Sequence, residues 1–236
     1  MQSEFVKTLI SAYKPLVIQR SKDPKSSSIG NGTKALSRVF ERYMSLENHL
    51  NKLGIIIHFL KTREITKPLQ DSGLRESEYY QYLFENYIVQ LVSTQDVCAK
   101  IGNELLVKRI AEKYCNAFTF IDNHEIKDSE SGQRLLELTE YLTNHRTNRH
   151  LIIHSGNFES HEAKDLDGLL YDHFMEGELE EEVKSFLTLE RDSKFLEQIQ
   201  NIQSTNEHIV EYCFAFLESL IPTLNERILI WTKIEQ

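Results

Sequence analysis

Glycine and proline are scarce in this chain, which has 9 glycines and 4 prolines in 236 residues. Sandwiches and barrels built from many short strands need frequent tight turns, and these two residues supply much of the backbone geometry of such turns. Their scarcity therefore argues against those folds. Long stretches with apolar residues at helical spacing are present instead, and they predict an all-α, multi-helix bundle.

Cysteine is also rare, and its three copies, Cys98, Cys115 and Cys213, lie far apart in apolar helical contexts. An odd number without paired spacing is unlike a disulfide framework or a zinc ribbon, so we expect three buried small side chains. This use of cysteine is typical of a reducing compartment, and we therefore expect a cytoplasmic protein.

Apolar runs long enough to cross a membrane are missing. The longest one is interrupted by His58, and the first residues carry charges that a signal peptide would not have among its apolar residues. We expect no association with a membrane. The formal net charge of −9 argues against long-range attraction to nucleic acid, so any contact with RNA must use a local basic site.

We expect a single domain over 1–236, with flexible connectors at 22–33, which is rich in Gly and Ser, and at 157–192, which is irregular and acidic. Asn148 is expected to be the N-cap of a short helix that ends near Ser155. The spacing of apolar residues predicts longer helices over about 3–20, 34–61, 75–103, 133–144 and 193–221.

The most informative stretch is 148–156, which reads Asn-Arg-His-Leu-Ile-Ile-His-Ser-Gly. Arg149 is a permanent cation with five donors that suit a phosphate, and His154 can take up and release a proton near neutral pH. On a helix, His150 and His154 share one face with Arg149 at its margin, and Arg146 extends that face by one turn. The stretch is therefore a polar strip equipped for acid–base chemistry at a phosphate.

This stretch resembles the signature of the HEPN superfamily (higher eukaryotes and prokaryotes nucleotide-binding). In that signature an arginine, usually followed by a polar residue, precedes a histidine by four to six intervening positions on an all-helical bundle. His150 stands where asparagine or aspartate is more usual. The resemblance is closest to stand-alone HEPN proteins of bacterial toxin and defence systems, and it implies a HEPN-like fold.

The resemblance implies a metal-independent endoribonuclease that needs no cofactor and works as a homodimer, with two motifs facing each other. The RNA 2′-hydroxyl would attack the neighbouring phosphate, while His154 moves a proton and Arg149 stabilises the developing charge. His150 would orient this pair or bind phosphate, and Arg146 and Asn148 would bind the substrate. An antitoxin or regulatory partner is also implied.

Other interpretations of the same residues stay open. If Arg149 and His154 act only as caps or ion-pair partners, the chain is a non-catalytic helical module that binds a nucleotide or a protein partner. His150 and His154 also have the spacing of metal ligands, but Leu151 replaces the glutamate of the His-Glu-x-x-His motif, so we expect no metal. Tyr80 is a further candidate, as a platform on which a base could stack.

Overall fold

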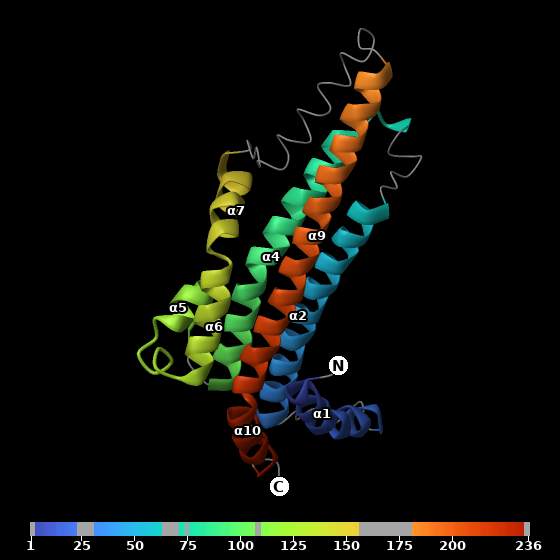
Figure 1. Ribbon diagram of the computed structural model, residues 1–236. Coiled ribbons are helices and arrows are strands. Elements are labelled where there is room, and N and C mark those ends of the chain that lie inside the picture. Colours follow the sequence, from blue (N-terminus) through green and yellow to red (C-terminus); the bar gives the residue numbers. More distant parts are fainter. Residues whose placement is uncertain are drawn as a thin grey trace. The chain divides into compact units, whose positions relative to one another are not determined.

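The computed structural model describes residues 3–22, 31–62, 71–73, 76–106, 110–155 and 181–233. Every regular element in these ranges is a helix, so the expected all-α class is confirmed (Figure 1). None of the described helices combines the length and the apolar character that crossing a membrane would require. The elements are α1 (Glu4–Lys22), α2 (Asn31–Thr62), α4 (Glu76–Leu106), the 3-10 helix η1 (Glu112–Tyr114), α5 (Ala117–Ile121), α6 (Glu130–Tyr141), α7 (Thr143–Ser155), α9 (Glu181–Ser219) and α10 (Ile221–Lys233).

The chain groups into two compact units, each assembled from segments that are distant in the sequence. Helices α2, α4 and α9 each contribute residues to both units. The single domain expected over 1–236 stays a prediction, since these units are defined by packing alone. Unit 1 comprises Met1–Leu50, Ser93–Leu142 and Ile209–Gln236, and unit 2 comprises Asn51–Val92 and Thr143–His208.

The core of unit 1 includes two aromatic rings that pack against a glycine of α4. Phe120 in α5 and Phe216 in α9 are fully buried, and their rings meet edge-on with centroids 6.4 Å apart. A Cβ at Gly102 would lie 2.5 Å from Cζ of Phe120 and 3.2 Å from Cζ of Phe216. Glycine at this position therefore allows both rings to approach the backbone of the helix directly.

The three cysteines lie in unit 1, and all of them are free and buried, as the sequence indicated. The thiol of Cys98 donates to Sγ of Cys213 at 3.8 Å, and this hydrogen bond together with burial raises the pKa of Cys98. Burial likewise raises the pKa of Cys115 to about 11. The Cys98 and Cys115 thiols therefore stay protonated near neutral pH, where a thiol is a poor nucleophile.

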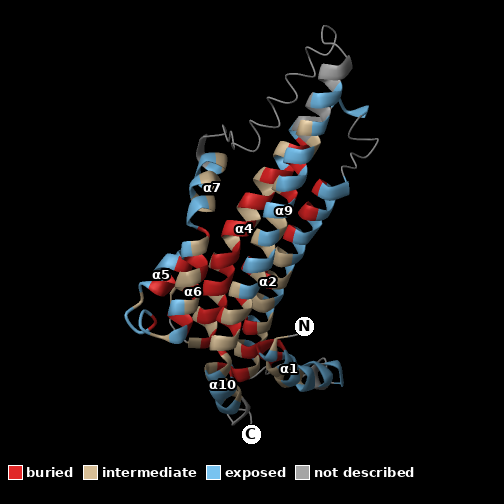
Figure 2. Ribbon diagram, viewed as in Figure 1, coloured by how far each residue is buried: buried red, intermediate tan, exposed pale blue. Residues whose placement is uncertain are grey.

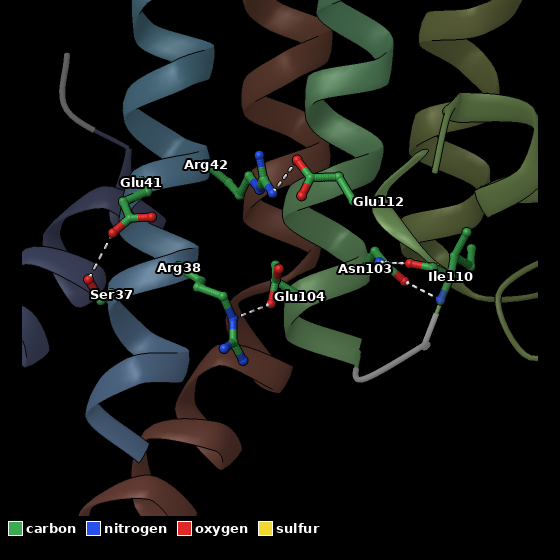
Figure 3. A network of polar contacts seen from close by, with 8 residues as sticks. All are labelled: Ser37, Arg38, Glu41, Arg42, Asn103, Glu104, Ile110 and Glu112. Atoms are coloured by element: carbon green, nitrogen blue, oxygen red, sulfur yellow. Dashed lines mark hydrogen bonds and ion pairs between the residues drawn. The ribbon is translucent and has the colours of Figure 1, made fainter. Parts of the chain in front are cut away.

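Ion pairs on the surface of unit 1 connect α2 with α4 and with η1 (Figure 3). Arg38 in α2 donates from Nε to Glu104 in α4 at 3.1 Å. Arg42, one turn further along α2, lies 2.6 Å from a carboxylate oxygen of Glu112 in η1. Exposed pairs of this kind contribute only about 0–1 kcal/mol each, so they orient these elements more than they stabilise them.

Side chains also cap the C-terminal end of α4, where helix carbonyl groups lose their intrahelical partners. Arg227 in α10 donates from Nε to the carbonyl oxygen of Leu105 at 3.1 Å. The Asn103 amide exchanges two hydrogen bonds with the backbone of Ile110, at 2.9 and 3.3 Å (Figure 3). These bonds hold Ile110 beside the last turn of α4.

In unit 2, α4 and α9 run parallel. The ring of Tyr80 packs on Phe195 with centroids 5.1 Å apart, and seven residues further along each helix the Tyr87 hydroxyl donates to the carbonyl oxygen of Ile202 at 3.1 Å. Both contacts join residues 115 positions apart, so the two helices keep one register over this length. Tyr80 is only 4% exposed, so its role is packing, and the structure does not support it as a candidate platform for stacking a base.

Two helices begin earlier than the sequence indicated. The start of α6 is Glu130 because the hydroxyl of Ser129 accepts a hydrogen bond from the backbone of Gly132 at 3.1 Å and so caps the helix. The start of α7 is Thr143, which places Asn148 inside the helix and not at its N-cap. No glycine or proline lies between 143 and 155, so nothing there opposes helix propagation.

The two expected connectors are shorter than predicted, since α2 already begins at Asn31 and α9 at Glu181. Residues 23–30 and 157–180 of these predicted connectors lie outside the described residues.

The packing around Gly102 predicts opposite effects for two glycine substitutions. Gly102→Ala should lower the free energy of unfolding by about 1–3 kcal/mol, because the methyl group collides with Phe120. The matched control Gly54→Ala also alters a helical glycine, but a Cβ there meets nothing within 4 Å. It should raise stability by about 0.5–1 kcal/mol through helix propensity. Urea unfolding of both variants measures the difference, and a Gly102→Ala variant as stable as wild type would contradict the packing.

Candidate functional site

Helix α7 carries the polar strip that the sequence singled out. None of its described side chains is buried, in contrast to the many buried positions of α4 (Figure 2). At 3.6 residues per turn, Thr143, Thr147 and His150 follow one another along one face, and His154 comes one turn later. The residues at 144, 145 and 148 lie about 100–200° around the helix from Thr143, toward the opposite side. The helix therefore offers two chemically different faces.

An open pocket of about 690 Å³ brings Arg146, Arg149 and His150 together on the first of these faces. All of its lining residues belong to unit 2. Two guanidinium groups, an imidazole and threonine hydroxyls can all donate hydrogen bonds, so the pocket suits an anion with several oxygens. The other lining residues are Val92, Thr143, Thr147 and Ile153.

Arg149 has an unmet hydrogen-bonding requirement. Its Nε is buried, and no acceptor meets it among the described residues. Leaving a buried donor without a partner costs about 1–3 kcal/mol, and more for a charged group. A phosphate oxygen would satisfy this donor, because the planar guanidinium fork matches phosphate geometry. This unsatisfied Nε makes Arg149 the candidate residue for binding an anion in the pocket.

Two other candidate site residues from the sequence, Asn148 and His154, are not among the described residues that line this pocket. Asn148 is absent from this pocket and lines a second one, on the other face of α7, so its expected contact with the substrate stays a prediction. His154 lies in α7, but its side chain is outside the described part of the structure, and its expected role as a proton carrier also stays a prediction. The described residues contain no cluster of three His, Cys, Asp or Glu side chains that could hold a metal.

Sequence reasoning missed the two threonines of the pocket. Thr143 and Thr147 precede His150 at spacings of seven and three residues, which place all three on one helical face. That signal was present in the sequence, but it depended on knowing that the helix begins before Asn148.

Two apolar side chains of α7 are open to solvent, and one of them, Ile153, lines the pocket. Leu151 is 41% exposed and Ile153 is 51% exposed, and both belong to α7. Single exposed apolar residues are common on protein surfaces. Here they accompany cationic residues on one short helix, which gives α7 a surface suited to contact with another macromolecule.

Comparison with known protein families supports the resemblance to the HEPN superfamily. The model of the Cthe2314-like HEPN family matches residues 36–218, more than three-quarters of the chain and a range that includes α7. The chain therefore belongs to the HEPN superfamily, and within it to the Cthe2314-like HEPN family. No curated protein and no solved structure matches it.

Proposed function

We propose that this HEPN protein is a metal-independent endoribonuclease whose site is formed by α7 of two copies. We further propose that it acts in a toxin–antitoxin or defence system, where an antitoxin or regulatory partner controls it. The observation that carries the proposal is the pocket that gathers Arg146, Arg149 and His150, with the Nε of Arg149 still in need of an acceptor. A phosphate of RNA has the charge and the oxygens to fill that need.

The chemistry is a transesterification. The RNA 2′-oxygen forms a bond to the neighbouring phosphorus while the bond to the 5′-oxygen of the next nucleotide breaks, which leaves a 2′,3′-cyclic phosphate and a 5′-hydroxyl. Arg149 and Arg146 stabilise the negative charge that develops on the non-bridging oxygens. His154 accepts the proton of the 2′-hydroxyl, and His154 of the second copy donates a proton to the leaving oxygen. His150 binds or orients the phosphate.

Two copies are required because one residue type supplies both the acid and the base. A two-fold axis places the same helix of each copy opposite the other and so provides both groups around one phosphate. The exposed Ile153, which lines the same pocket, supports this arrangement, because an apolar side chain at that contact would lose water-exposed surface. The local concentration of arginine on α7 also offsets the overall charge of −9 where RNA would bind.

The exposed Leu151 and Ile153 also support a second candidate function. A non-catalytic HEPN module could use α7 to bind a nucleotide or a protein partner, since a fold alone does not establish an activity. The two candidate functions differ in whether the protein cleaves RNA with the help of His154 or only binds its partner.

Substitution of the two motif residues separates these functions. His154→Ala should lower the rate of RNA cleavage by about 10²–10⁴-fold, the usual contribution of general acid–base catalysis, while RNA binding persists. Arg149→Ala should abolish cleavage and weaken RNA binding with a smaller salt dependence, since one phosphate contact is lost. Arg149→Lys should recover little, because a point charge does not replace a planar fork. The measurements are cleavage of a labelled RNA pool and binding at several salt concentrations.

Matched controls for this experiment lie elsewhere on the surface. His208→Ala removes an exposed histidine of α9, and Arg134→Ala removes an arginine of α6 that pairs with Glu137 at 3.1 Å. Both variants should cleave RNA like wild type, and thermal melts should show that all the variants are folded. Cleavage by His154→Ala at the wild-type rate, or no cleavage of any RNA by wild type, would exclude the ribonuclease. Failure of His154→Ala to fold would assign that residue a structural role.

Chelation tests the chemistry independently of mutation. Cleavage should continue at an undiminished rate in excess EDTA, because the proposed proton transfers use histidine and the charge is stabilised by arginine. Loss of cleavage in EDTA that zinc or manganese restores would contradict this mechanism. Such a result would favour His150 and His154 as a pair of metal ligands.

The assembly can be tested by light scattering coupled to size exclusion. The protein should elute with twice the chain mass of 27.6 kDa. Ile153→Glu should shift it toward monomer, because a carboxylate buried at an apolar contact is unfavourable. The matched control Leu229→Glu alters a leucine of α10 that is 61% exposed, and it should leave the mass unchanged. A monomeric wild type at micromolar concentration would count against the shared site.

A further inference from the structure

A second pocket of unit 2 lies between α4, α7 and α9. It is on the opposite face of α7 from the pocket lined by Arg146 and Arg149, here called the arginine pocket. Its volume is about 230 Å³. Phe84, Tyr87 and Ile88 of α4 are buried and provide an apolar floor, since spacings of three and four residues place them on one helical face. The pocket is thus formed by three helices and not by a loop or a helix end.

The walls of this pocket are rich in carboxamides. Asn144 and Asn148 come from α7, and Gln198 and Asn201 come from α9. The described residues that line it include no Asp, Glu, Lys or Arg. A carboxamide both donates and accepts hydrogen bonds without carrying charge. His145 of α7 also lines the pocket, and the four carboxamides around this imidazole suit a neutral ligand with both donors and acceptors on its edge.

Gln198 supplies evidence that a donor is missing from the pocket. Its Oε1 is buried and has no hydrogen-bond partner among the described residues. An unsatisfied buried acceptor is destabilising by about 1–3 kcal/mol, so such groups in a native protein call for an explanation. A ligand N–H placed in the pocket would satisfy this oxygen.

The size of the pocket limits the ligand. Sites for drug-sized molecules usually have volumes of roughly 300–1,000 Å³, and this pocket is smaller. One flat ring system fits such a space, with a face on the apolar floor and its polar edge toward the amides. Asn and Gln are the side chains that pair with the donor and acceptor edge of a base, and unstacked bases are held by ring contacts together with edge hydrogen bonds.

We propose that this pocket binds a nucleobase, as part of a nucleoside or of an RNA strand, through the amides of α7 and α9. Gln198 accepts a hydrogen bond from the edge of the base, and the residues of α4 contact its face. The site is separate from the arginine pocket and does not depend on the ribonuclease activity proposed above, because its ligand needs neither a phosphate nor a proton carrier.

Titration calorimetry with adenosine, guanosine, cytidine and uridine tests the proposal on the full chain. At least one of the four should bind with a Kd of about 1 mM or lower. Gln198→Leu should weaken it about tenfold, which is the effect of losing one hydrogen bond of ordinary strength. This variant should fold, since leucine removes a buried oxygen that has no partner. If thermal melts show otherwise, Asn201→Leu, at an exposed lining residue, provides the same comparison.

Asn206→Leu is the matched control. Asn206 lies on α9, and its Oδ1 is also buried without a partner, but it does not line the pocket. This variant should bind the nucleoside within about twofold of wild type, well below the effect of one hydrogen bond. The proposal is overturned if no nucleoside binds at ~10 mM, a concentration well above that Kd. It is also overturned if Gln198→Leu binds like wild type, or if Asn206→Leu loses as much affinity as Gln198→Leu.

A short 2′-O-methyl oligonucleotide, which lacks the nucleophilic hydroxyl, distinguishes the two sources of the base. Weaker binding of this oligonucleotide to Gln198→Leu than to Asn206→Leu would show that a base of the RNA strand enters the pocket. Equal binding of the oligonucleotide, with nucleoside binding still weakened by Gln198→Leu, would assign the pocket to a free nucleoside.

Discussion

In unit 2, the pocket lined by the amides of α7 and α9 depends on the parallel register of α4 and α9. Two contacts one heptad apart, Tyr80 with Phe195 and Tyr87 with Ile202, hold this register. A slip by one residue would rotate each side chain by about 100° around its helix axis. Such a rotation would turn Gln198 away from the apolar floor on α4, so the chemistry of the pocket depends on contacts that bind no ligand.

Helix α7 then separates two kinds of polar chemistry. Its cationic face has Arg146 and His150 one turn apart, and its opposite face has Asn144 and Asn148 one turn apart. Charged and neutral hydrogen-bonding groups are thereby kept from competing for one ligand. In a chain of net charge −9, the proposed recognition of an anion would depend on this local pair of arginines.

The features that depend on helical periodicity could be predicted from the sequence. The helix starts, which depend on capping, and the second pocket, which depends on packing between distant segments, could not. The all-α class and the grouping of Arg146 with His150 follow from a period of 3.6 residues. The start of α6 depends on a single capping hydroxyl at Ser129, and that of α7 shifted by five residues with no local signal against it. The pocket lined by Asn144, Asn148 and Gln198 could not be predicted from the sequence, because Gln198 lies near α7 only when α4 and α9 pack side by side.

In the proposed dimer, the two cationic faces of α7 would confront each other, and two such faces repel. Screening at physiological salt acts over about 8 Å, so it does not remove repulsion between groups that share one phosphate. Contact between the exposed Ile153 side chains of the two copies would oppose this repulsion, and a bound phosphate would cancel it by placing negative charge between the arginines. RNA binding and dimerisation therefore stabilise each other, because a ligand that binds only the paired state shifts the equilibrium toward pairing.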